Sequence, residues 1–99
     1  MQGRRFKLLR GPQLLGSVTC TADDDPWFSG TFEPTSAFSE VEPLFAAELA
    51  FLQAEDLERW DSAYAAAVGP GLRLEPDDAG PSVPEPILHF HEHEVRWRF

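Results

Sequence analysis

The sequence of 99 residues contains one cysteine, few basic residues and no long apolar run. Because Cys20 has no second cysteine to pair with, the chain forms no internal disulfide, which is typical of a reducing compartment. No segment approaches the roughly 20 apolar residues of a membrane-spanning helix. The first residues, MQGRRFKLL, also lack the apolar stretch of a signal peptide. We therefore expect a cytoplasmic protein without a membrane partner.

Positive charge is also scarce. Eight Lys and Arg residues stand against 17 Asp and Glu residues, so the formal net charge is −9. This balance argues against nucleic acid as a partner, because a phosphate backbone repels an acidic surface. The middle of the chain is acidic, whereas most of the cations are near its two ends, namely Arg4, Arg5, Lys7, Arg10, Arg96 and Arg98.

Patterns typical of catalysis and cofactor binding are missing as well. The seven glycines are scattered and form no phosphate-binding loop. Cys20 lies in an alternating segment, where a small buried thiol is the usual role. The acidic runs at residues 23–25 and 77–78 lack the spacing of a calcium-binding loop. The sequence therefore predicts no cofactor and leans against an enzyme.

The N-terminal third contains patterns of three strands. Two β-prone segments, RRFKLL and LLGSVTCT, flank a turn at residues 10–13 and predict a hairpin. After a turn at residues 23–26, the segment WFSGTFEP predicts a third strand. Gly30 within it indicates a bulge or the close approach of another backbone.

The apolar period becomes helical between residues 39 and 68. Ser39 and Glu42 fit a capping box at a helix start. Apolar stripes at helical spacing follow and predict one bent helix or two, which end at residues 69–71. A short strand is expected at residues 72–74 and an exposed, proline-rich loop at residues 75–86.

The last residues, ILHFHEHEVRWRF, predict a β-hairpin. A turn at residues 91–92 would pair Phe90 with His93 and Leu88 with Val95. One face would then carry the apolar residues Leu88, Phe90, Val95, Trp97 and Phe99. The opposite face would carry His89, Glu94, Arg96 and Arg98, and this segregation supports the register.

These segments predict a single α+β domain over residues 1–99. Hydrophobic residues make up 42% of the chain, which is ample for one core. We expect an antiparallel sheet of about five or six strands, packed on one face by one bent helix or two helices and ending in the hairpin. The predicted core comprises Phe6, Leu8, Val18, Phe32, Phe45, Leu49, Leu52, Trp60, Tyr64, Leu88, Phe90, Val95 and Trp97.

The order of these segments resembles that of small uncharacterised bacterial α+β proteins of about this length. The most recognisable part of the likeness is Asp25-Pro26-Trp27 with Gly30, Phe32 and Pro34, a D-P-W-x-x-G-x-F-x-P pattern. The resemblance implies a compact bacterial cytoplasmic domain. It carries no activity and no catalytic residue to this chain.

Two groups of side chains are candidate sites. If the first and last strands share a sheet, its face away from the helices collects a cationic group that could bind an acidic partner. This predicted cationic face comprises Arg5, Lys7, Arg96 and Arg98. Alternatively, His89, His91 and His93 could ligate a metal ion, although three successive side chains on one face of a strand do not readily surround an ion.

These observations favour a non-catalytic module that binds another protein, in an accessory or inhibitory role. A metal-binding protein or metal-dependent enzyme that uses the C-terminal histidines is the alternative. A binder of small ligands between sheet and helices is a third hypothesis. A monomer and a homodimer are both compatible with the sequence, since an open sheet has unpaired edges.

Overall fold

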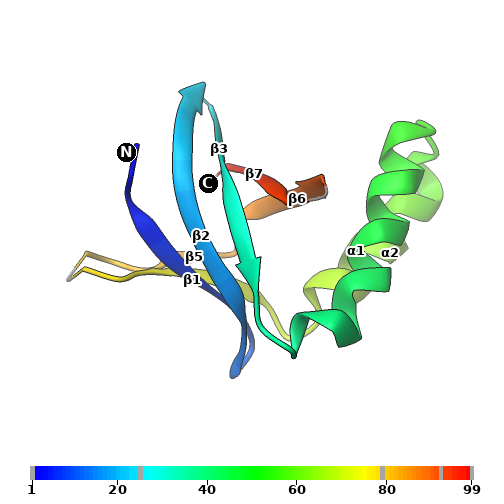
Figure 1. Cartoon of the computed structure of the whole chain (residues 1–99). Helices are drawn as coiled ribbons and strands as arrows, with labels where there is room; N and C mark the ends of the chain where they lie inside the picture. The colour runs from blue at the N-terminus through cyan, green and yellow to red at the C-terminus, as the bar shows by residue number, and fades with distance from the viewer. Residues whose placement is uncertain (1, 25, 79, 92, 99) are drawn as a thin grey trace.

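The computed structural model describes residues 2–24, 26–78, 80–91 and 93–98, and it places two helices against a curled antiparallel sheet (Figure 1). The helices are α1 (Phe38–Gln53) and α2 (Leu57–Val68). The strands are β1 (Arg5–Arg10), β2 (Gln13–Asp24), β3 (Trp27–Pro34), β4 (Leu72–Pro76), β5 (Val83–Pro84), β6 (Ile87–His91) and β7 (Glu94–Arg98).

Over the described residues the sheet has seven strands in the order β5-β4-β1-β2-β3-β7-β6. The α+β fold with a terminal hairpin is therefore confirmed. The strand beyond the expected five or six is β5, which has two residues and lies where the sequence predicts a loop. In the same part of the chain, no helix has the length and apolar character needed to cross a membrane.

The first three strands form a meander, and Gly30 on β3 lies next to a β-bulge in it. Cys20 pairs with Gly30 and Ala22 with Ser29, so Thr21 is the extra residue of a β-bulge in β2. A Cβ at position 30 would collide with the main-chain oxygen of Thr19. Gly30 therefore permits the close backbone approach that the sequence indicates.

The helical region contains two helices, and the predicted capping box is wrong. Ala37 occupies the N-cap position without a side-chain hydrogen bond, so α1 starts earlier than Ser39. The Ser39 hydroxyl instead donates to the main-chain oxygen of Ser36, at 2.8 Å. Glu55, with a φ of 58°, lies between the helices, and Asp56 caps α2 by accepting the Arg59 N–H.

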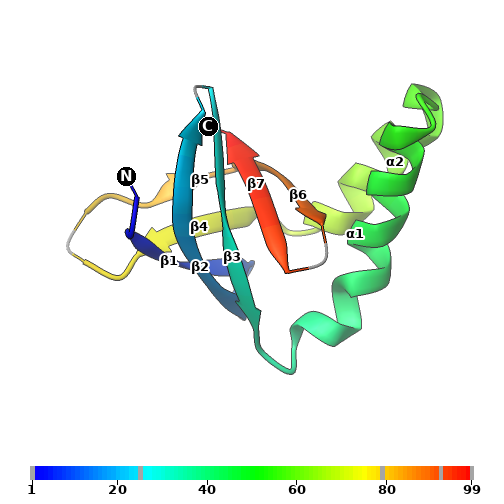
Figure 2. The ribbon, with the colours of Figure 1, turned by 45° about the horizontal axis from the view of Figure 1, so that its top comes forward.

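The helices lie beside β6, which is an edge strand of the sheet (Figure 2). From α2, the Tyr64 hydroxyl donates to the main-chain oxygen of Pro86 and accepts the N–H of Leu88, at 3.4 and 3.3 Å. This side chain thus satisfies backbone groups that a further strand would otherwise pair. At the C-terminal end of α2, the Arg10 guanidinium donates to the main-chain oxygens of Ala66 and Ala67.

The register predicted for the C-terminal hairpin is wrong by two residues. Phe90 pairs with Val95, Leu88 with Trp97 and His91 with Glu94, so His91 belongs to β6 and not to the turn. Glu92, the other residue of the predicted turn, lies outside the described residues. Because side chains alternate with a period of two, this shift leaves the described side chains of the hairpin strands on their predicted faces. Leu88, Val95 and Trp97 are fully buried, whereas Phe99 lies outside the described residues.

Most of the predicted core is buried. The exceptions are partly exposed residues near the helices and the hairpin, namely Leu49, Leu52, Trp60, Tyr64 and Phe90. These five lie where α1 and α2 meet the edge of the sheet. The packing is therefore least closed along this seam, and the candidate site lies there.

Candidate functional site

Two adjoining hollows lie along α1. The larger has a volume of about 700 Å³ and separates α1 from the β6–β7 hairpin. We call it the aromatic groove; among its lining residues are Phe32, Pro34, Phe38, Glu42, Phe45, Ala46, Phe90, His93 and Glu94. The smaller, the Arg96 pocket, has a volume of about 260 Å³ and is lined by Trp27, Leu49, Leu52, Gln53, His89, His91 and Arg96. Leu49, Gln53 and His91 line both.

Four phenylalanines form the floor of the aromatic groove. The ring of Phe90 lies 4.8 Å from that of Phe32 and 5.0 Å from those of Phe38 and Phe45, between centroids. Phe38 and Phe45 are seven residues apart on α1 and therefore share one side of the helix. Phe32 and Phe90 are contributed by β3 and β6. The floor thus joins one helix to two strands of the sheet.

The rim of the groove carries only acidic formal charges. Glu42 on α1 and Glu94 on β7 are exposed, and no Lys or Arg is among the lining residues described. His91 and His93 add imidazoles on the hairpin side. The groove therefore combines an apolar floor with a negative rim, on a chain whose net charge is −9.

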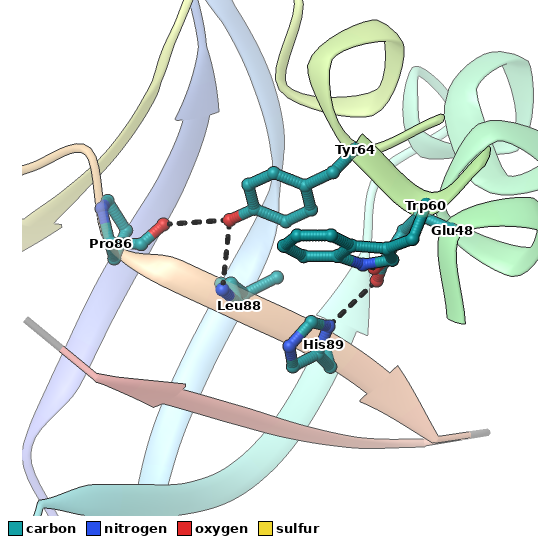
Figure 3. Close-up of polar contacts among 6 residues, drawn as sticks. All are labelled: Glu48, Trp60, Tyr64, Pro86, Leu88 and His89. Carbon is teal, nitrogen blue, oxygen red and sulfur yellow. Dashed lines mark hydrogen bonds and ion pairs between the residues drawn. The ribbon is translucent and has the colours of Figure 1, made fainter. Parts of the chain in front are cut away.

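A buried polar pair, Glu48 and His89 (Figure 3), adjoins the Arg96 pocket, because His89 is one of its lining residues. Glu48 is completely buried, and its Oε1 lies 2.8 Å from His89 Nδ1. Trp60 Nε1–H donates to Oε2 of the same carboxylate at 2.9 Å. A buried carboxylate is costly unless its oxygens are hydrogen-bonded, and here each oxygen has a partner. The pair joins α1, α2 and β6.

Glu48 was not predicted as a site residue, although its position in the sequence indicates burial. It follows Phe45 by three residues and precedes Leu52 by four, so it falls within the apolar stripe of α1. A carboxylate in such a stripe needs a buried partner. The sequence offered several histidines as partners but no means to choose His89.

Trp27 and Arg96 complete the pocket, and Arg98 lies nearby on the same strand. The Trp27 and His89 ring centroids lie 5.9 Å apart. The guanidinium carbon of Arg96 lies 5.2 Å from the Trp27 ring centroid, and that of Arg98 lies 5.8 Å from it. Both distances are within the range of cation–π contacts. Arg96 lines the pocket, whereas Arg98 does not.

The structure arranges the predicted cationic face as two pairs. Arg5 and Lys7 lie on β1, whereas Arg96 and Arg98 lie on β7, with β2 and β3 between them. Three strand spacings separate the pairs by about 14 Å. All four side chains are exposed, and Arg5 Nε lies 3.8 Å from an Asp77 oxygen. Partner binding by the four together stays a prediction.

The three histidines occupy different surroundings. His89 is 8% exposed and its Nδ1 is held by Glu48, whereas His91 and His93 are exposed beside the groove. Within the described ranges, no group of three or more His, Cys, Asp or Glu side chains is arranged to hold a metal ion. The geometry therefore gives the metal hypothesis no support.

Cys20 is buried on β2, with its Sγ near the Asp23 carboxylate at 3.5 Å. Burial, followed by the hydrogen bond and the charge of Asp23, raises the pKa of this thiol. A thiol with a raised pKa is mostly protonated at neutral pH and is a weak nucleophile. Its surroundings therefore suit a structural role.

Comparisons of the chain with protein-family models, with curated proteins and with solved structures find no match. The chemistry of the site rests on its own geometry. The aromatic groove can take an apolar side chain next to a positive group. The Arg96 pocket can take a small apolar group next to a negative one.

Proposed function

We propose that this protein is a non-catalytic binding module that holds a basic, extended segment of a partner protein in the aromatic groove. The observation that carries the proposal is the combination of a four-phenylalanine floor with a rim whose formal charges are all negative. Such a site matches an apolar side chain flanked by Lys or Arg.

The dimensions of the groove support a peptide as its occupant. Its volume of about 700 Å³ lies within the range of ligand sites. The 16 residues of α1 give a wall about 24 Å long at about 1.5 Å per residue. Roughly seven residues of an extended chain, at about 3.3 Å each, would match that wall.

The charges specify how the segment would lie. A central Phe, Leu or Trp side chain would pack on top of the floor formed by Phe45 and Phe90. A Lys or Arg on each side of this anchor would approach Glu42 or Glu94. The net charge of −9 would also speed the encounter with a basic partner at low salt.

These properties favour an accessory or inhibitory role, in which the module covers a basic segment of a larger protein. A cytoplasmic site of action is part of the same proposal. It is supported by the single thiol, Cys20, which has no second cysteine for a disulfide.

The test is a calorimetric titration with the acetylated and amidated peptide KRFLKR. Peptides EEFLEE and KRAAKR serve as probes of the charge and of the apolar anchor. The protein variant is Glu42→Lys/Glu94→Lys, which reverses the rim. Its matched control is Glu40→Lys/Glu58→Lys, which makes the same change of net charge at exposed positions outside the groove.

We expect binding of KRFLKR, weaker by about tenfold or more with the reversed rim and by no more than about twofold with the control. EEFLEE and KRAAKR should bind at least about tenfold more weakly than KRFLKR. Equal losses in both variants, or equal binding of KRAAKR, would show attraction by net charge alone and would refute the proposal.

A further inference from the structure

We infer that the Arg96 pocket is a binding site for a small organic carboxylate with an apolar body. This inference is independent of the peptide proposed for the aromatic groove. It concerns a different hollow, a ligand of the opposite charge and a different set of side chains.

The residues that line the pocket indicate a negatively charged ligand. Arg96 carries the formal charge of that lining, and the other polar groups there are the imidazoles of His89 and His91 and the amide of Gln53. On a chain with a net charge of −9, a pocket whose formal charge is positive is a local exception. A guanidinium binds a carboxylate through two parallel hydrogen bonds.

The guanidinium of Arg96 is held in position before any ligand arrives. It lies over the Trp27 ring at 5.2 Å, and among the described residues it forms no ion pair. Its donors therefore remain available. The contact with the indole reduces the side-chain entropy that binding would otherwise cost.

His89 supplies a second polar contact from beneath. Its ring is nine-tenths buried, and its Nδ1 is held by the fully buried Glu48. Within the described ranges, Nε2 has no hydrogen-bond partner, and His89 lines the pocket. This arrangement fixes the plane of the imidazole. In the doubly protonated ring, Nδ1–H donates to Glu48 and Nε2–H is left to donate to the ligand carboxylate.

The remaining surface selects the body and the charge of the ligand. Leu49, Leu52 and the Trp27 ring provide apolar walls around about 260 Å³, which suits a compact group such as a phenyl ring. One guanidinium offsets a single negative charge. A phosphate monoester carries about −1.5 to −2 at neutral pH, so a carboxylate matches the pocket better.

The test uses benzoate as the probe, with benzamide and phenyl phosphate as neutral and doubly charged analogues. Binding is followed by calorimetry and by the NMR signals of the Trp27 indole N–H and the His89 ring. The variant is Arg96→Gln. Its matched control is Arg98→Gln, which removes the second cation from the same indole but lies outside the pocket lining.

We expect benzoate to bind with a dissociation constant on the order of 1 mM or lower, and to shift both the Trp27 and the His89 signals. Arg96→Gln should weaken binding by about tenfold or more, and Arg98→Gln by no more than about twofold. Both arginines are exposed, so circular dichroism should show the same fold for both variants.

Three results would overturn the inference. The first is the absence of benzoate binding at about 10 mM, well above the expected dissociation constant. The second is equal or tighter binding of benzamide or phenyl phosphate. The third is an equal loss in the two arginine variants, which would place the anion on the general surface around Trp27 rather than in the pocket.

Discussion

Removal of the Glu48 carboxylate should cost a large part of the stability of this protein. In Glu48→Ala, the indole N–H of Trp60 and the Nδ1 of His89 both lose a partner inside a region where Glu48 itself is 0% exposed. Breaking a buried, hydrogen-bonded pair by deleting one member costs about 3–5 kcal/mol. A domain of this length has a total unfolding free energy of about 5–15 kcal/mol.

The measurement is urea unfolding followed by far-ultraviolet circular dichroism. With an m-value of about 1–2 kcal/mol/M, the expected loss of about 3–5 kcal/mol lowers the midpoint by roughly 1.5–5 M. Glu42→Ala is the matched control, because Glu42 lies on the same helix but is exposed, and such substitutions change stability by about 0.5 kcal/mol or less.

Two further variants separate hydrogen bonding from packing. Glu48→Gln keeps the side-chain volume and an acceptor for the Trp60 N–H, so it should recover a large part of the loss. Glu48→Leu/His89→Leu replaces both members of the pair and should be more stable than Glu48→Leu alone. If Glu48→Ala were no less stable than Glu42→Ala, the Glu48 carboxylate would not be buried from water. The prediction that its hydrogen bonds stabilise the fold would then be refuted.

Two other predictions concern Tyr64 on α2 and Gly30 on β3. Tyr64 is the single tyrosine, and burial, as the largest cause, raises its pKa above the ordinary value of about 10. The neutral phenol is therefore favoured in the folded protein. Its contribution to the free energy of unfolding is complete below the pKa of Tyr64 in the unfolded chain and is lost as pH rises through its pKa in the folded protein. Tyrosinate absorbance should show a midpoint above that of urea-unfolded protein, and a coincident midpoint would contradict the burial of the Tyr64 hydroxyl. Gly30→Ala should lower the unfolding free energy by about 2–3 kcal/mol, because the new methyl collides with the Thr19 backbone. The neighbouring change Ser29→Ala should have little effect in the same urea titration, and equal stability of the two variants would exclude the collision.

The sequence predicted the elements of the fold well because their apolar periods are strong. Faces could be predicted even where register could not, as the terminal hairpin shows. Its alternation assigns Leu88 and Trp97 to the core in either register, since registers two residues apart bury the same side chains. The turn, which contains no favoured hairpin pair, did not choose between them.

The candidate site was less predictable because it depends on contacts between distant segments. Glu48 and His89 are 41 residues apart, and their pairing follows from how α1 packs against β6. Trp27 approaches Arg96 only because β3 and β7 are neighbours in the sheet, an order that local patterns do not encode. The individual residue types were visible, but their convergence required the topology.

The Tyr64 hydroxyl also bears on aggregation. An edge strand with free N–H and C=O groups is a template on which another chain can extend a sheet. At β6 one hydroxyl engages the N–H of Leu88 and the C=O of Pro86 together, and α2 lies over them. Fibril growth from this edge of the native protein would first require α2 to detach, so its rate should depend on the opening of one helix rather than on protein concentration alone.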